Sequence, residues 1–184
     1  MILVDKDIKE YVARKELIIS GYNETNINGV SYDLTMDVAY NSDGGENRIY
    51  ELAPGEVVFI KTQEKISIPN NILGRVGEKN SRMRQGLKVD APFYQPGHVT
   101  YVFLRVQNLS SSIIELSRGS KIAQIMFEQL TSEPDVPYDK QVNTSFQDEV
   151  NYVGLGNYKE EYERQTKRRI DEAKNDIEAM SQRI

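Results

Sequence analysis

The chain has 184 residues and a mass of 21.1 kDa, and 39% of its residues are hydrophobic, which suffices for one domain with an appendage. It contains no cysteine and a single histidine, so disulfides, thiolate metal sites and histidine-rich metal sites are excluded. The net charge of -5 and the sequence pI of 5.1 argue against a general nucleic-acid-binding protein, but they allow a small basic pocket.

The first fifteen residues lack the long apolar core of a signal peptide, and no run of the sequence approaches the length of a membrane span. We therefore expect a cytoplasmic protein that binds neither membranes nor nucleic acid. The first predicted element is a short helix that Asp5 can cap. Its apolar positions at helical spacing are Ile8, Tyr11 and Val12. Residues 17–19 are predicted to form a short strand, and the polar, glycine-rich residues 41–47 an exposed loop.

Short, turn-bounded β segments dominate the chain from that point to about residue 130. The predicted strands are 57–60, 66–68, 72–76, 99–106, 113–116 and 122–127. The markers of the turns between them are Pro54-Gly55, Pro69-Asn70-Asn71, Pro96-Gly97 and Arg118-Gly119. Many short strands separated by glycine and proline predict a mainly β fold of the sandwich, jelly-roll or barrel type.

A basic segment lies in the middle of these strands. Its cations are Arg75, Lys79, Arg82, Arg84 and Lys88, and Glu78 is its one acid, which gives a local charge of +4 (five minus one). Three glycines, Gly74, Gly77 and Gly86, allow backbone amides to approach a phosphate closely. The segment therefore indicates an anionic partner, and the alternative is a solvated loop whose charges serve solubility.

The predicted strand 99–106 alternates between two faces. Tyr101, Phe103 and Arg105 share one face, and the apolar side chains of the strand share the other. An arginine beside aromatic residues is either a rim residue that extends to solvent or a buried group paired with an anion or a carboxylate.

These segments resemble the dUTPase and dCTP deaminase superfamily from Met1 to about Leu130. The pieces that carry the resemblance, in order, are MILVDKDI at the start, NINGVSYDL at 26–34, residues 74–87, residues 90–106 and RGSKIAQIMFEQL at 118–130. The resemblance implies a dUTPase-like jelly-roll or barrel-type fold with a short N-terminal helix, a homotrimer, and deoxypyrimidine nucleotide sites between neighbouring subunits. It also implies nucleotide-binding roles for the residues at the positions of the family motifs, namely Lys79, Asn80, Ser81, Arg84 and Gln124.

The chain departs from the family pattern at the catalytic positions. Arg105 stands where the deaminases have their proton-shuttling glutamate, and arginine cannot accept a proton from water. Gln95 stands where both families have aspartate, and glutamine is not a base either. Lys79 replaces the family's arginine, so a point charge replaces a bidentate fork while the hydroxyl of Ser81 remains.

Asp90 and Glu78 are the carboxylates near the implied site that could replace the missing base, whereas Asp33 is expected to hold the fold. His98 follows the Pro96-Gly97 turn and is either a packing residue or an acid or base near neutral pH. No protein-ligated metal is predicted, so Mg²⁺ would be carried by the nucleotide.

The sequence divides into a β domain at 1–130, an extended arm at 131–157 and a C-terminal helix at 158–184. The apolar positions of that helix, spaced three and four apart, are Ile170, Ala173, Ile177, Met180 and Ile184. This stripe predicts a helix that docks on its own domain, a partly frayed tail, or a coiled coil.

The sequence therefore predicts a homotrimeric protein that binds a deoxypyrimidine nucleoside triphosphate and whose catalytic acid and base positions are replaced. One alternative is an active dCTP deaminase or dUTP diphosphatase that uses a rearranged base. The other alternative is a non-catalytic regulator or interaction scaffold.

Overall fold

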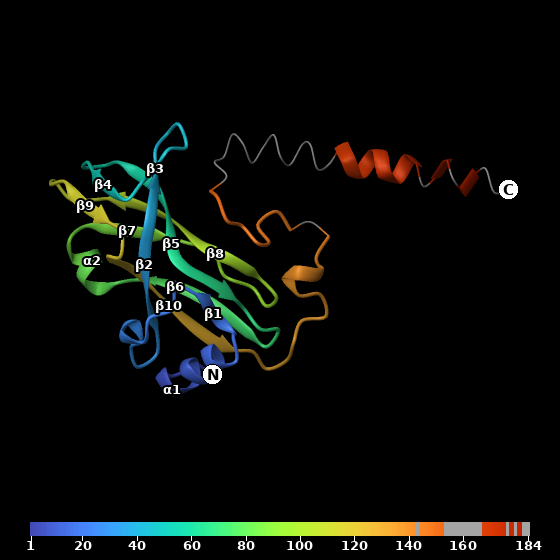
Figure 1. Cartoon of the computed structure of the whole chain (residues 1–184), viewed down its shortest axis with the longest axis horizontal. Helices are drawn as coiled ribbons and strands as arrows, with labels where there is room; N and C mark the ends of the chain where they lie inside the picture. Colours follow the sequence, from blue (N-terminus) through green and yellow to red (C-terminus); the bar gives the residue numbers. More distant parts are fainter. Residues whose placement is uncertain (143, 153–166, 176, 179, 182–184) are drawn as a thin grey trace. The chain divides into compact units, whose positions relative to one another are not determined.

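The computed structural model describes residues 1–142, 144–152, 167–175, 177–178 and 180–181. The chain divides into two compact units, Met1–Tyr152 and Val153–Ile184. The first unit contains every strand that the structure describes, and Figure 1 shows helix α1 near the N-terminus, at the opposite end of the strands from β4 and β9.

The helix α1 (Asp5–Ala13) begins one residue earlier than the sequence predicts. Val4 is its N-cap residue, so the assignment of Asp5 as the cap is wrong, and Asp5 is the first helical residue. The Asp7 carboxylate instead accepts a hydrogen bond from the backbone N–H of Val4 at 3.0 Å. Ile8 is fully buried and faces the core, as its helical spacing predicts.

The strands form one eight-stranded antiparallel sheet and one two-stranded sheet, which confirms the predicted mainly β, dUTPase-like fold with a short N-terminal helix and a C-terminal helix. The strands are β1 (Leu17–Ser20), β2 (Tyr32–Tyr40), β3 (Glu46–Asn47), β4 (Ile49–Leu52), β5 (Val57–Ser67), β6 (Ile72–Glu78), β7 (Leu87–Asp90), β8 (Val99–Asn108), β9 (Ile114–Ser117) and β10 (Lys121–Gln129). The large sheet has the order β6-β10-β2-β5-β8-β7, with β1 on β5 and β3 on β2, and β4 pairs with β9. Two 3₁₀ turns, η1 (Glu24–Asn26) and η2 (Tyr138–Lys140), lie between or after the strands.

Strand β5 differs from its prediction, because the predicted segment 57–60 and the first two residues of the segment 66–68 belong to one continuous strand, and Ile68 lies just beyond its end. The pairing of β5 with β8 shifts between Lys61 and Lys65, and Glu64 is fully buried at this irregularity. The Glu64 carboxylate accepts hydrogen bonds from the backbone N–H of Thr35 at 3.0 Å and from its hydroxyl at 2.7 Å. Burial raises the pKa of Glu64, and the bonds from Thr35 offset part of that effect. Hydrogen bonds between Thr35 of β2 and Glu64 of β5 therefore satisfy the buried polar residue that interrupts the apolar pattern of β5.

The alternation predicted for β8 is confirmed. Thr100, Val102, Leu104 and Val106 are buried, whereas Tyr101, Phe103 and Arg105 are partly or largely exposed on the opposite face. The side chains of β8, β5, β2 and β10 make up most of the core; β8 buries every second residue, whereas β2 is buried along almost its whole length. The outward side chains of β8 therefore do not belong to the core.

In the second unit, residues 167–175, 177–178 and 180–181 are helical. Ile170, Ile177 and Met180 of the predicted stripe are exposed, and Ile184 lies outside the described residues. Among the residues that the structure describes, no helix is long and apolar enough to cross a membrane.

Candidate functional site

The basic segment is not wholly a loop. Residues Asn80–Arg84 form the short helix α2, and Lys79 is its N-cap residue. The five cations of the segment differ in their partners. Three of them are paired with carboxylates, namely Arg75 with Glu128, Lys79 with Asp33 and Lys88 with Asp90. Arg82 and Arg84 have no carboxylate partner among the described residues: Arg84 donates to the side-chain oxygen of Asn80 at 3.0 Å, and Arg82 to a backbone carbonyl.

The buried Asp33 of β2 lies between two lysines, Lys79 and Lys121, and we call these two the lysine pair. One carboxylate oxygen contacts the Nζ of Lys79 at 2.9 Å and the Nζ of Lys121 at 3.1 Å. The other oxygen accepts from the amide of Asn28 at 3.0 Å. Asp33 is 1% exposed, and burial by itself raises the pKa of Asp33, but the bonds from Lys79, Lys121 and Asn28 outweigh it and hold that pKa below its usual range.

Two ammonium groups thus share one carboxylate, which leaves the lysine pair with one positive charge in excess. The Lys79 and Lys121 side chains are 27% and 40% exposed, so both ammonium groups remain accessible from solvent. A partly buried, pre-positioned cation pair can bind phosphate oxygens through charge-assisted hydrogen bonds. Lys121 is a site residue that sequence reasoning missed, because only the pairing of β10 with β2 brings it to Asp33.

Gln124 of β10 connects the strands around the lysine pair. It lies opposite Asp33 on β2 and opposite Gly77 on β6. Its side-chain oxygen accepts from the hydroxyl of Ser31 at 2.9 Å, and its amide donates to the backbone carbonyl of Glu78 at 3.0 Å. These contacts position β2 and β6 relative to each other, so Gln124 supports the cluster.

Glu78 links this cluster to the other group of predicted residues. Its carboxylate accepts from the backbone N–H of Val89 on β7 at 3.0 Å. The next residue, Asp90, contacts Arg105 of β8 at 3.1 Å and Lys88 at 3.1 Å. Bonds from Lys88 first and from Arg105 second lower the pKa of Asp90, which makes its carboxylate a weak base.

The Arg105 side chain is 56% exposed, which agrees with a rim residue and not with a buried one, and it pairs with the carboxylate of Asp90 at the surface. It lies on the outward face with Phe103, as the alternation predicts.

His98 and Gln95 lie beside the segment that follows β10. The His98 ring stacks on Tyr138 with centroids 4.0 Å apart, and its Nε2 lies 2.9 Å from the carbonyl oxygen of Phe146, to which it donates. Burial lowers the pKa of His98, and the bond to Phe146 offsets part of that effect. Gln95 accepts a hydrogen bond from the side chain of Gln141 at 3.3 Å. The structure therefore separates His98 and Gln95 from the hydrogen bonds of the lysine pair.

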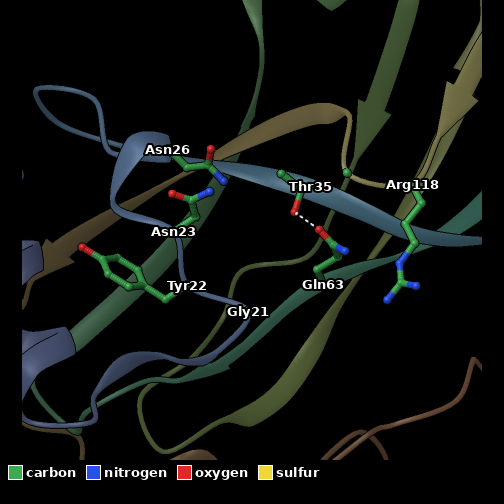
Figure 2. Close-up of a pocket in the computed structure, with 8 residues that line it drawn as sticks. Gly21, Tyr22, Asn23, Asn26, Thr35, Gln63 and Arg118 are labelled. Carbon is green, nitrogen blue, oxygen red and sulfur yellow. Dashed lines mark hydrogen bonds between the residues drawn. The ribbon is translucent and has the colours of Figure 1, made fainter.

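A polar pocket of about 560 Å³ has Thr35 of β2 in its lining, and Thr35 is the register partner of Lys121 on β10. Figure 2 shows Thr35 and Gln63 facing each other between two asparagines and Arg118. The pocket is lined by Gly21, Tyr22, Asn23, Asn26, Thr35, Gln63, Arg118 and Gly119. Across the described part of the chain, no group of three or more histidine or acidic side chains is arranged to hold a metal ion.

Comparison with known proteins gives one consistent result. The family model described as dCTP deaminase-like matches residues 44–130. The chain is 27% identical over 173 residues to "dCTP deaminase, dUMP-forming" of Dictyoglomus turgidum, which covers 79% of this chain and 89% of that protein. It is 30% identical over 164 residues to the protein of the same name from Corynebacterium glutamicum (strain R), which covers 75% of this chain and 86% of the relative.

The structure is also similar to the crystal structure of 2'-deoxycytidine 5'-triphosphate deaminase from Agrobacterium tumefaciens. The TM-score is 0.61 at 17% sequence identity, and the match covers 70% of this chain and 47% of that chain. This chain thus spans about half the length of that protein, and the likeness is one of fold.

Proposed function

Because this chain belongs to the dCTP deaminase-like family, within the dUTPase and dCTP deaminase superfamily, we propose that it binds a deoxypyrimidine nucleoside triphosphate. The observation that carries the proposal is the lysine pair, whose two ammonium groups share the single buried carboxylate of Asp33. A triphosphate would supply the negative charge that this arrangement lacks, and any Mg²⁺ at the site would arrive with the nucleotide.

The phosphate chain is assigned to the region around α2. Lys79 and Lys121 would contact phosphate oxygens, and the hydroxyl of Ser81 and the guanidinium of Arg84 lie on the same short helix. Arg84 bonds an asparagine and no described carboxylate, so its charge is available to a ligand. Gln124 would act by holding β2 and β6 in place.

We further propose that the protein binds the nucleotide without the standard deaminase mechanism. Arg105 occupies the position of the family's glutamate and is paired with Asp90, whose basicity is lowered by Lys88 and Arg105 together. The alternative is an active dCTP deaminase or dUTP diphosphatase that uses another base, and it rests on the names of the relatives.

A thermal-shift screen against the deoxynucleoside triphosphates, dUTP included, tests the proposal. At a ligand concentration 100 times Kd, binding adds about 2.7 kcal/mol of stability, which corresponds to a Tm increase of about 5 to 10 °C for a chain of this size. We expect this increase with dCTP, dUTP or dTTP and not with the uncharged deoxynucleosides. Chromatography of the same mixtures should show no conversion of dCTP or dUTP.

The controls separate the alternatives. Conversion at about 1 per second or faster would show a working enzyme, and Asp90→Asn and His98→Ala would then identify its base. An unchanged Tm with every triphosphate would rule out the proposed function.

We also propose a homotrimer, since the resemblance implies nucleotide sites between neighbouring subunits. Light scattering should give a mass near three times the 21.1 kDa of the chain. A stable monomer at micromolar concentration would contradict a shared site, whereas nucleotide binding by that monomer would leave the binding proposal intact.

A further inference from the structure

The segment 146–152, which we call the strap (orange in Figure 1), lies along the first half of β8, where no described strand pairs with the edge opposite β5. Strand β7 pairs only with the second half of β8, from Arg105 to Asn108. Along the first half, the backbone N–H of Asp148 donates to the carbonyl of Val99 at 2.7 Å, and the N–H of Tyr101 donates to the carbonyl of Glu149 at 3.2 Å. The strap thus satisfies backbone groups of the sheet edge that would otherwise face solvent.

The last residue of the strap, Tyr152, fills a space between three aromatic rings, which we call the aromatic slot. The slot consists of Tyr40 of β2, Phe59 of β5 and Phe103 of β8. The Tyr152 ring stacks on Phe59 with centroids 4.6 Å apart and an interplanar angle of 24°. Its centroid lies 5.2 Å from that of Tyr40 and 6.3 Å from that of Phe103. Three adjacent strands therefore build a seat for one planar ring.

Cations border the aromatic slot. Arg105 is the register partner of Phe59, and Lys61 is the register partner of Phe103. Lys61 is only 9% exposed, and its Nζ lies 4.2 Å from the ring centroid of Tyr101. Within the described ranges it forms no ion pair, although burying an ammonium group without a counter-charge is unfavourable. The slot thus combines flat ring faces with a nearly buried cation that has no anionic partner among the described residues.

The start of the strap is anchored: the Phe146 carbonyl accepts from the buried His98, and the Gln147 side chain accepts from the N–H of Val99 and donates to the carbonyl of Gly97. The part that could be released is 148–152, where the contacts of Asp148 add little. Asp148 has a φ of 55°, in the left-handed region that costs a non-glycine residue free energy. Its carboxylate pairs with Lys65, and Asp148 is largely exposed in that pair, so the pair adds little.

We propose that the aromatic slot is the seat of the nucleotide's pyrimidine base and that Tyr152 occupies it in the free protein, so that the strap competes with the ligand. This inference rests on the proposed function. The base would stack where the Tyr152 ring now lies, and Lys61 would pair with an acceptor or a negative charge of the bound nucleotide.

Two substitutions with opposite expected effects test the competition. Tyr152→Ala removes the competing ring and should tighten nucleotide binding by about 2- to 12-fold, the range for one aromatic contact. Lys61→Met keeps the length of the side chain without its charge and should weaken binding by about 2- to 30-fold. Tyr152→Phe keeps the ring and should bind like the wild type. Calorimetric titration with dCTP, dUTP and dTTP gives the dissociation constants.

Tyr11→Ala is a matched control, because this tyrosine lies on α1, and it should leave the dissociation constant unchanged. Since the chain has no cysteine, a fluorophore on Asn151→Cys reports on the strap alone. Its emission should change on addition of the nucleotide that binds best, and it keeps the test valid if Tyr152→Ala does not fold.

The outcomes separate this inference from the function on which it rests. Weaker binding by Tyr152→Ala would mean that Tyr152 contacts the ligand instead of competing with it, and unchanged binding would mean that its role is structural; either result overturns the inference. The inference would also be overturned if the labelled Asn151→Cys protein, otherwise wild type, binds nucleotide but the fluorophore emission does not change. If neither wild type nor Tyr152→Ala binds any nucleotide, both the function and the inference fail.

Discussion

Replacement of Asp33 with alanine should lower the free energy of unfolding by about 3 kcal/mol. The buried carboxylate of Asp33 is the shared counter-charge of Lys79 and Lys121 and the acceptor for Asn28. Removal of one partner of a buried ion pair costs about 3 to 5 kcal/mol, because the charge that remains is uncompensated. Both lysines are partly exposed, so water compensates part of the loss and the lower end of that range applies. Urea unfolding with a linear extrapolation measures the difference.

Asp37→Ala is a matched control on the same strand. Asp37 pairs with Arg118 at 3.0 Å, but their side chains are 24% and 44% exposed. A pair of that kind contributes about 0 to 1 kcal/mol, so the control should lose far less stability than Asp33→Ala. Equal losses in the two variants would contradict the central position that we assign to Asp33.

The pH dependence follows from the direction of the shift in the Asp33 pKa. Burial raises that pKa, the bonds from Lys79, Lys121 and Asn28 outweigh the effect, and the folded-state value is lower than the unfolded one. The contribution of Asp33 is therefore fully present above the unfolded pKa of about 3.9 and is lost as the pH falls through the folded pKa. The stability difference between wild type and Asp33→Asn should thus shrink below about pH 4 and stay constant between pH 5 and 7.

Local patterns predict much of this fold, because alternation of side chains and turn signals depends only on neighbouring residues. The outward placement of Phe103 and Arg105 follows from the period of two in β8. The apolar spacing predicts helix α1 correctly, but the sequence does not predict where the helix begins. Asp5 is a residue type that commonly caps helices, yet the N-cap residue is Val4.

The parts that sequence reasoning missed depend on partners distant in the chain. The polar residues in the middle of β5 predict a break, but Glu64 stays in the strand since Thr35 of β2 bonds its carboxylate. Helix α2 has five residues, which is too short to show a helical period. Lys121 has no local signal as a site residue, because its partner Asp33 is known only once β10 pairs with β2.

The contacts of the residues at the family's catalytic positions also depend on partners distant in the chain, so the sequence alone does not predict them. The resemblance places Arg105 at the position of the deaminase glutamate, but its pairing with Asp90 follows from the register of β7 and β8. His98 could be a packing residue or an acid or base from its sequence context. In the structure it is buried, stacks on Tyr138 and bonds the strap carbonyl of Phe146, which are the contacts of a packing residue.

Removal of both members of the lysine pair should have the largest effect on nucleotide binding. Lys79→Ala or Lys121→Ala alone should weaken triphosphate affinity by about 1.5 to 3 kcal/mol, the range for one charged hydrogen bond. With either lysine present, the Asp33 carboxylate stays compensated. The double variant leaves this buried negative charge beside the phosphates, so its loss should reach at least the sum of the single losses, about 3 to 6 kcal/mol.

Two further variants distinguish this electrostatic account from a general loss of structure. Adding Asp33→Asn to the double variant removes the uncompensated charge and should restore part of the affinity, although it also removes the last ionic group of the cluster. Lys6→Ala, on the exposed side of α1, should leave binding unchanged. Calorimetric titration at two salt concentrations should also show a weaker salt dependence in the double variant, because fewer charges contact the ligand. Unchanged affinity in Lys79→Ala would instead identify the basic segment as a solvated surface, since a phosphate site at α2 cannot lose its central ammonium group without losing affinity.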